Sequence, residues 1–146
     1  MTMNDNATPT CRVVRPGEPV VGKQGLTYEV GVSAETVGAR AIHMQTLTLP
    51  PGARGTPHKH EHHETAIFAI EGVSGCWYGE DLREHARIHA GDYFYIPANM
   101  PHLPYNDGEV PFVAVIARTD PNEQEGVVLL DDPGATPPPV DHSDAS

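Results

Sequence analysis

The chain has 146 residues, enough for one domain with a sizeable core and too few for two ordinary ones. Its 20 acidic residues against 9 Lys and Arg give a formal charge of −11. That excess repels phosphate backbones and anionic lipids, so we expect neither nucleic acid nor membranes as partners.

Residues 1–20 are predicted to form an N-terminal extension that includes an edge strand. They contain no charged stretch followed by an apolar run, so no signal peptide is expected. Nowhere do eighteen apolar residues follow one another, as a membrane helix requires. The two cysteines, Cys11 and Cys76, form neither a disulfide framework nor a CxxC pair. These observations predict a cytoplasmic protein with reduced thiols.

Residues 21–130 are predicted to form one all-β domain. Short runs rich in β-branched and aromatic residues alternate there with Gly and Pro, over residues 41–49, 65–72, 75–79, 92–97 and 111–118. This pattern favours antiparallel strands in a sandwich or barrel. No helical periodicity is long enough to compete.

Residues 131–146 are acidic, rich in proline and almost free of large apolar residues. We predict a disordered tail. The alternative is an extended arm that lies along a neighbouring subunit.

Three histidines and one glutamate carry the strongest functional signal. In an extended strand alternate residues share a face, so His58 and His60 point the same way, and Glu64 does too if the strand stays regular. His102 comes from a second segment, as expected for a chelate that folding assembles. Three imidazoles and one carboxylate are typical ligands of a mononuclear metal centre.

The two segments resemble the two signature motifs of the cupin superfamily. Positions that fit the motifs are Gly52, His58, His60, Glu64, Gly91, Pro97, His102 and Asn106. Asn99 stands where the second motif has Gly, and Asn tolerates the left-handed backbone of such a turn. The resemblance covers about residues 38–120. It implies a small single-domain cupin, a double-stranded β-helix or jelly roll, over residues 21–130.

The first motif has one irregularity. Seven residues, rather than the motif's six, separate Glu64 from Gly72. Counting back from Gly72 leads to Thr65, a poor metal ligand, so we predict Glu64 as the ligand and a one-residue bulge after it. His62 and His63 are the alternative ligands, because neutral imidazole binds divalent transition metals well.

Further side chains are candidates for catalysis or substrate contact. Glu64, His62 and His63 are candidate bases. His43 and Gln45 share a strand face and are candidates for the substrate pocket, with ordinary packing as the alternative. Tyr105 and Asn106 are candidates for its rim.

The resemblance implies one divalent transition metal ion per subunit, which is Fe, Mn, Zn, Ni or Co. It implies an enzyme that acts on a small molecule, foremost an oxygenase or dioxygenase. The alternatives are a non-oxidative cupin, namely an isomerase, a lyase, a decarboxylase or an enzyme of specialised metabolism that forms nitrogen–nitrogen bonds, and a non-enzymatic ligand-binding cupin. Since similar cupins pair through their sheets, we expect a homodimer, with contacts around residues 26–32 and 127–130.

Overall fold

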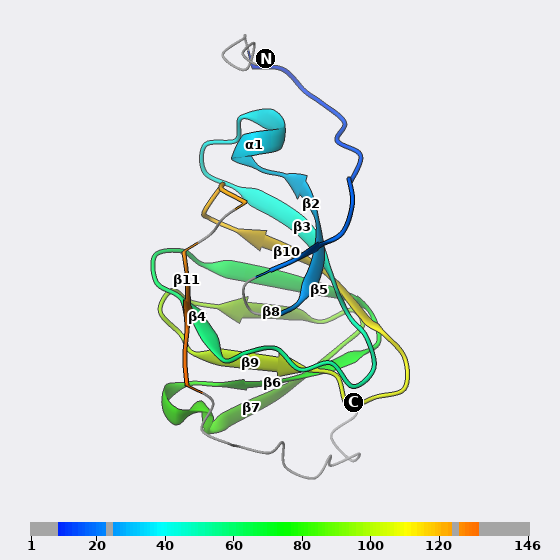
Figure 1. The fold of residues 1–146 in the computed structure, drawn as a ribbon, viewed down its shortest axis with the longest axis vertical. Coiled ribbons are helices and arrows are strands. Elements are labelled where there is room, and N and C mark those ends of the chain that lie inside the picture. Colours follow the sequence, from blue (N-terminus) through cyan, green and yellow to red (C-terminus); the bar gives the residue numbers. More distant parts are fainter. Residues whose placement is uncertain (1–8, 23–24, 124–125, 132–146) are drawn as a thin grey trace.

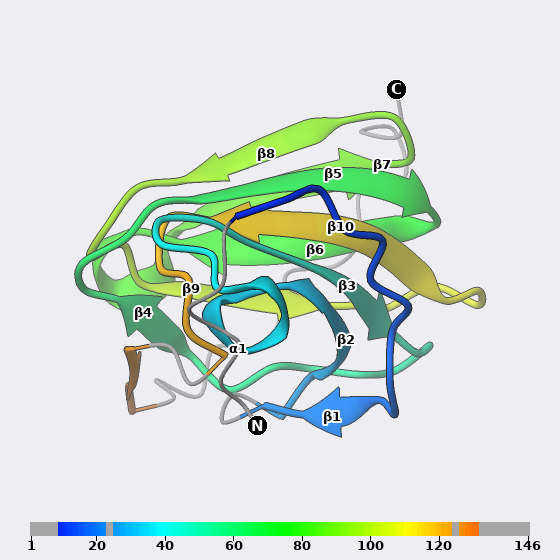
Figure 2. The same cartoon turned by 90° about the horizontal axis from the view of Figure 1, so that it is seen from above.

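The fold is two facing antiparallel sheets, seen in a computed structural model that describes residues 9–22, 25–123 and 126–131 (Figures 1 and 2). The six-stranded sheet contains, in spatial order, β1 (Val20–Val21), β2 (Thr27–Val32), β3 (His43–Leu49), β10 (Phe112–Arg118), β5 (Thr65–Glu71) and β8 (Tyr93–Ile96). The five-stranded sheet contains β11 (Val127–Leu129), β4 (His58–His60), β9 (His102–Tyr105), β6 (Val73–Tyr78) and β7 (Glu84–His89). This confirms the predicted all-β jelly roll.

Helical structure is limited to one short α-helix, α1 (Ala34–Val37), and a 3-10 turn, η2 (Glu80–Leu82), within the described residues. Ser33 caps α1 by accepting a hydrogen bond from the backbone N of Thr36. In this part of the chain no helix has the length and apolar character needed to cross a membrane.

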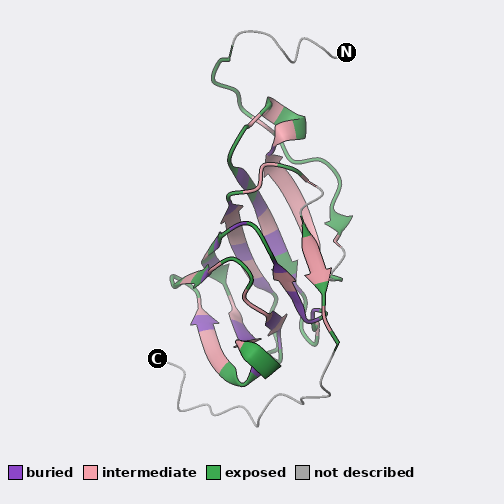
Figure 3. Ribbon diagram, turned by 90° about the vertical axis from the view of Figure 1, so that its left-hand side faces the viewer, coloured by how far each residue is buried: buried purple, intermediate pink, exposed green. Residues whose placement is uncertain are grey.

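Alternation along the central strands of the six-stranded sheet separates the interior from the outer face. Every second residue of β3 is buried, from His43 to Leu49, as expected for a strand with one covered face. The interior contains a cluster made of Leu26, Leu47, Leu49, Ala69, Cys76, Ile88, Phe112 and Ala114. Figure 3 shows these buried stretches as purple bands within the strands.

Polar residues replace apolar ones at one end of this interior. β10 lies between β3 and β5 and runs antiparallel to both, so its last residue, Arg118, pairs with the first residues of its neighbours, His43 and Thr65. All three are buried. The inner face of the six-stranded sheet is therefore apolar over most of its length and polar at the end where these three residues lie.

The predicted bulge in β5 is present. Val113 of β10 pairs with Glu71 and the next residue, Ala114, pairs with Ala69, so Ile70 is the extra residue. Ile70 is exposed, whereas Thr65 and Ala69 are buried. The bulge therefore leaves Thr65, and not Glu64, on the inward side of the strand.

Both predicted domain boundaries lie near edge strands. β1, at residues 20 and 21, pairs with β2, and β11 pairs with β4. The predicted tail is residues 131–146, of which 132–146 lie outside the described part of the chain, so the division into 1–20, 21–130 and 131–146 stays a prediction.

Candidate metal centre

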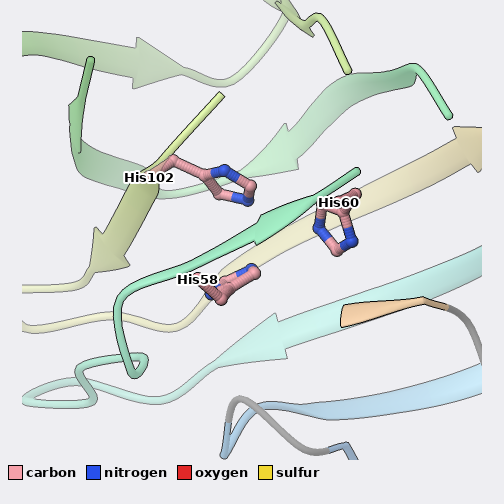
Figure 4. Close-up of side chains that lie close together, drawn as sticks. All are labelled: His58, His60 and His102. Atoms are coloured by element: carbon pink, nitrogen blue, oxygen red, sulfur yellow. The ribbon is translucent and has the colours of Figure 1, made fainter. Parts of the chain in front are cut away.

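Three buried histidines of the five-stranded sheet converge on one point. His58 and His60 lie on the same face of β4, and His58 pairs directly with His102 of β9. One ring nitrogen from each lies within 4.8 Å of the others. The ring centroids of His58 and His102 are 4.2 Å apart. Figure 4 shows the three side chains close together, with His58 and His60 on one strand and His102 at the start of another.

Backbone carbonyls orient two of these rings. His58 Nδ1 is 2.6 Å from the carbonyl oxygen of Thr56, and His102 Nδ1 is 2.8 Å from that of Met100. A carbonyl oxygen only accepts, so each Nδ1 carries the proton and donates it. Nε2 then keeps its lone pair, as metal-binding histidines with a carbonyl partner do. This donor set fits a divalent transition metal.

The structure does not bring Glu64 to the three imidazoles, which corrects the predicted ligand set. Glu64 is exposed, and its Oε1 accepts a hydrogen bond of 2.8 Å from the Tyr95 hydroxyl. That bond raises the pKa of Tyr95. The next residue, Thr65, is buried and lines the interior cavity. Successive strand residues face opposite sides, so a shift of one residue places a hydroxyl where a carboxylate was expected.

Neither of the two alternative ligands belongs to the triad. His62 is exposed. His63 is buried, with its ring centroid 4.8 Å from that of His60 and its Nδ1 3.7 Å from a carboxylate oxygen of Asp120. Among the described residues the group that could hold an ion contains neither. His63 therefore flanks the centre and remains a candidate base.

The facing sheet contributes the other polar side chains. Gln45 lines the cavity, and its Oε1 accepts a hydrogen bond of 2.7 Å from Nε2 of buried His43. Arg118, a residue that the sequence analysis missed, also lines the cavity. The alternation through Phe112, Ala114 and Arg118 at the end of β10 was the signal that could have found it.

Tyr105 and Asn106 do not rim the cavity, which corrects the second group of predicted contacts. Tyr105 faces away from the cavity. The residues that line the cavity in β9 are His102 and Pro104, which point to the opposite face of the strand from Tyr105. Its hydroxyl lies 2.7 Å from Nε2 of His85.

Asn106 has a structural role. Its Nδ2 donates to the carbonyl oxygens of Leu49 and Val110, at 2.9 Å each, and its Oδ1 accepts from the backbone N of Gly108. The side chain therefore joins the loop between β9 and β10 to the end of β3.

The cavity between the sheets is small and mostly apolar. It offers a water-sized molecule about 60 Å³ of space, several times the ~10–15 Å³ that one ordered water needs. Its polar lining consists of His58, His60, His102, Gln45, Thr65, Ser74 and Arg118. Cys76 also lines it, and burial raises the pKa of that thiol to about 12. The thiol is therefore neutral at physiological pH.

Known proteins of this architecture were compared with the chain. An uncharacterized conserved protein with a double-stranded beta-helix domain from Klebsiella pneumoniae is 22% identical, with a TM-score of 0.61, over 82% of this chain and 92% of that one. Oxalate decarboxylase from Bacillus subtilis is 22% identical, with a TM-score of 0.66, over 78% of this chain and 30% of that one. Another structure of that enzyme concerns its Mn(II) centers. These likenesses show the fold alone.

No curated protein sequence matches the chain. The family model of the cupin domain matches residues 45–117, which is half of the sequence. This stretch contains all three histidines of the candidate centre. The chain therefore belongs to the cupin domain family.

Proposed function

We propose that the protein is a mononuclear metal-dependent enzyme that acts on a small molecule in the cavity, foremost as an oxygenase. The observation that carries the proposal is the buried triad of His58, His60 and His102, with two rings oriented by carbonyls. A divalent ion in this site would supply Lewis acidity and, if it is redox-active, chemistry with dioxygen. Fe, Mn, Zn, Ni and Co all suit imidazole ligands.

The side chains around the triad suggest how the protein would treat a substrate. Apolar walls such as Leu47, Leu49 and Ile96 make the surroundings of the triad less polar than water, which strengthens electrostatic interactions inside the cavity. Three neutral imidazoles leave a divalent ion with its full charge of +2, so anionic oxygen ligands such as enolates, catecholates and carboxylates suit the site.

Proton transfer is assigned to His63 in this proposal. Its buried ring lies beside that of His60, and its Nδ1 is 3.7 Å from a carboxylate oxygen of Asp120. Glu64 and His62, the other two candidate bases, are both exposed.

The test is metal analysis followed by dioxygen uptake, on protein purified without a histidine tag. We expect about one divalent ion per chain and substrate-dependent loss of O2 with enols or catechols. Tightly held zinc without O2 loss would contradict the oxygenase. Wild-type protein that binds no divalent ion would contradict the whole proposal.

A non-oxidative cupin is the second candidate. The observation that favours it is charge, because a dication and the buried Arg118 would stabilise an anionic oxygen without any oxidation. Turnover of a carboxylate, such as isomerisation or decarboxylation, without O2 loss would favour this candidate. Saturable binding without turnover would favour a ligand-binding cupin instead. We also propose that the chain forms a homodimer.

A further inference from the structure

Arg118 is a buried cation in the cavity wall. Its side chain is 4% exposed and lines the same cavity as the three histidines, but from the facing sheet. It pairs across the strands with Thr65, the residue that stands where a carboxylate ligand was expected. Directly paired residues of antiparallel strands have side chains on the same face, about 5 Å apart at Cβ. Arg118 and Thr65 therefore form one polar surface.

Two oxygens of the described residues contact the guanidinium. Its NH2 group donates to the carbonyl oxygen of Asn122 at 2.6 Å, and NH1 lies 3.4 Å from Oε1 of Gln45. Since that Oε1 also accepts from His43, both of its lone pairs are engaged, and Gln45 has only its amide N–H groups left to offer. The hydrogen-bonding groups on this wall are therefore mainly donors.

The cavity also lacks negative charge. None of the described residues that line it is Asp or Glu, although the chain as a whole has a net charge of −11. Glu64 is turned outward to Tyr95, and Cys76 is a neutral thiol. A ligand that brings its own negative charge would meet a cation that is already removed from water, so the desolvation cost of the cation is not added on binding.

We propose that Arg118 and Gln45 form a carboxylate-binding subsite, and that the substrate is a small carboxylate with a short apolar chain. The planar guanidinium suits a carboxylate because it can donate two parallel hydrogen bonds to it. Leu47, Ile67 and Ile116 line the space available to the chain. That the bound carboxylate is a substrate rests on the proposed function. Its binding at Arg118 and Gln45 can be tested without that function.

The experiment compares butyrate with its neutral amide, butyramide, by calorimetry on the protein as purified. We expect butyrate to bind about tenfold more tightly, the size of one charge-assisted hydrogen bond. Arg118→Met should remove this preference and leave butyramide binding within about twofold. Ile88→Val, a change in the same cavity without loss of charge, is the matched control and should keep the preference. Metal content and thermal unfolding are measured for each variant.

Gln45→Glu provides a second variant that keeps the arginine. A carboxylate at this position would pair with Arg118 and compete with the ligand, so the butyrate preference should fall by about tenfold. This result is expected even if Arg118→Met does not fold.

The location of the carboxylate is decided by a third variant. His102→Ala, which removes a metal ligand, should keep the preference if Arg118 holds the carboxylate. A preference that survives both Arg118→Met and Gln45→Glu but disappears in His102→Ala would place the carboxylate on the metal. This result would overturn the proposed subsite and leave the proposed metal-dependent enzyme unaffected. Equal binding of butyrate and butyramide by the wild type would also overturn it. Wild-type protein without metal would instead count against the proposed function alone.

Discussion

The imidazole of His102 joins the second strand of the metal centre to the first. It is the one member of the triad that comes from β9, and the other two lie on β4. Binding of an ion is therefore coupled to the correct pairing of two strands, and the free energy of binding contributes to folding.

We predict that His102→Ala removes most of the bound metal, because two ligands from one strand form a much weaker chelate than three. His63→Ala is the matched control, since His63 is a buried histidine beside the centre but outside the triad. Elemental analysis after equal dialysis measures the outcome. Metal retained in His102→Ala at the stoichiometry of the wild type would contradict the assignment.

The charge of the centre depends on which of residues 64 and 65 points inward. Glu64 points outward, so we predict that Glu64→Gln leaves metal affinity within about twofold of the wild type. Thr65→Glu should raise it by roughly tenfold, or about 1.4 kcal/mol, because it adds a carboxylate on the inward side. Competition with a chelating dye measures both. Loss of metal in Glu64→Gln as large as in His102→Ala would show that Glu64 is a ligand.

At the scale of elements, β5 illustrates what the sequence could predict. Its alternation, and that of β3 and β10, predicted strands close to those observed. The extra residue before Gly72 indicated a bulge, which lies at Ile70. Spacing alone, however, allowed both Glu64 and Thr65, and the chemistry of a carboxylate favoured the wrong one. Only the pairing of Thr65 with Arg118 decides which residue points inward.

Arg118, Tyr105 and Asn106 were misjudged for a related reason. A sequence shows which residues alternate, but the partner of a polar side chain comes from a distant segment. Asn106 forms a hydrogen bond with Leu49, and Tyr105 forms one with His85. No pattern in the neighbouring sequence specifies these pairs.

The outer surface of the five-stranded sheet contains a close approach between β6 and β9. A Cβ on Gly75 would run into the ring of Tyr105, whose hydroxyl is held by His85. We predict that Gly75→Ala destabilises the fold by about 1–3 kcal/mol through overpacking. Gly17→Ala, where no atom lies within 4 Å of the new Cβ, should change stability by less than about 0.5 kcal/mol. Urea unfolding measures both, and equal midpoints for the two variants would refute the prediction.

At the scale of the whole molecule, the outer face of the six-stranded sheet is unusually apolar. Its exposed large side chains include Met44, Phe68, Ile70, Tyr93 and Tyr95. A patch of this kind commonly marks an interface. The contact predicted around residues 26–32 needs correction in part, because Leu26 is buried and lines the cavity.

We predict a two-fold homodimer at micromolar concentration that uses this outer face. The double variant Ile70→Asp and Tyr93→Asp should be monomeric, because dimer formation would bury two carboxylates without partners at the contact. Val13→Asp, at an exposed position outside both sheets, is the control for added charge. Light scattering after size exclusion measures the mass. A wild-type mass near 15.8 kDa throughout this range would contradict the dimer.

None of the described residues that line the cavity is acidic, whereas the chain as a whole is, so ligand entry and ligand retention should depend differently on salt. A carboxylate that diffuses inward must first cross the repulsive field of a chain with net charge −11. Added salt shortens the range of that field from about 30 Å at 0.01 M to about 8 Å at 0.15 M, whereas the buried Arg118 is screened much less. The association rate of butyrate should therefore rise with ionic strength while its dissociation rate changes little, and butyramide should show neither effect. Line widths of the ligands in NMR spectra would report these rates, and an association rate of butyrate that falls with salt would show that local positive charge at the entrance outweighs the net charge of the chain.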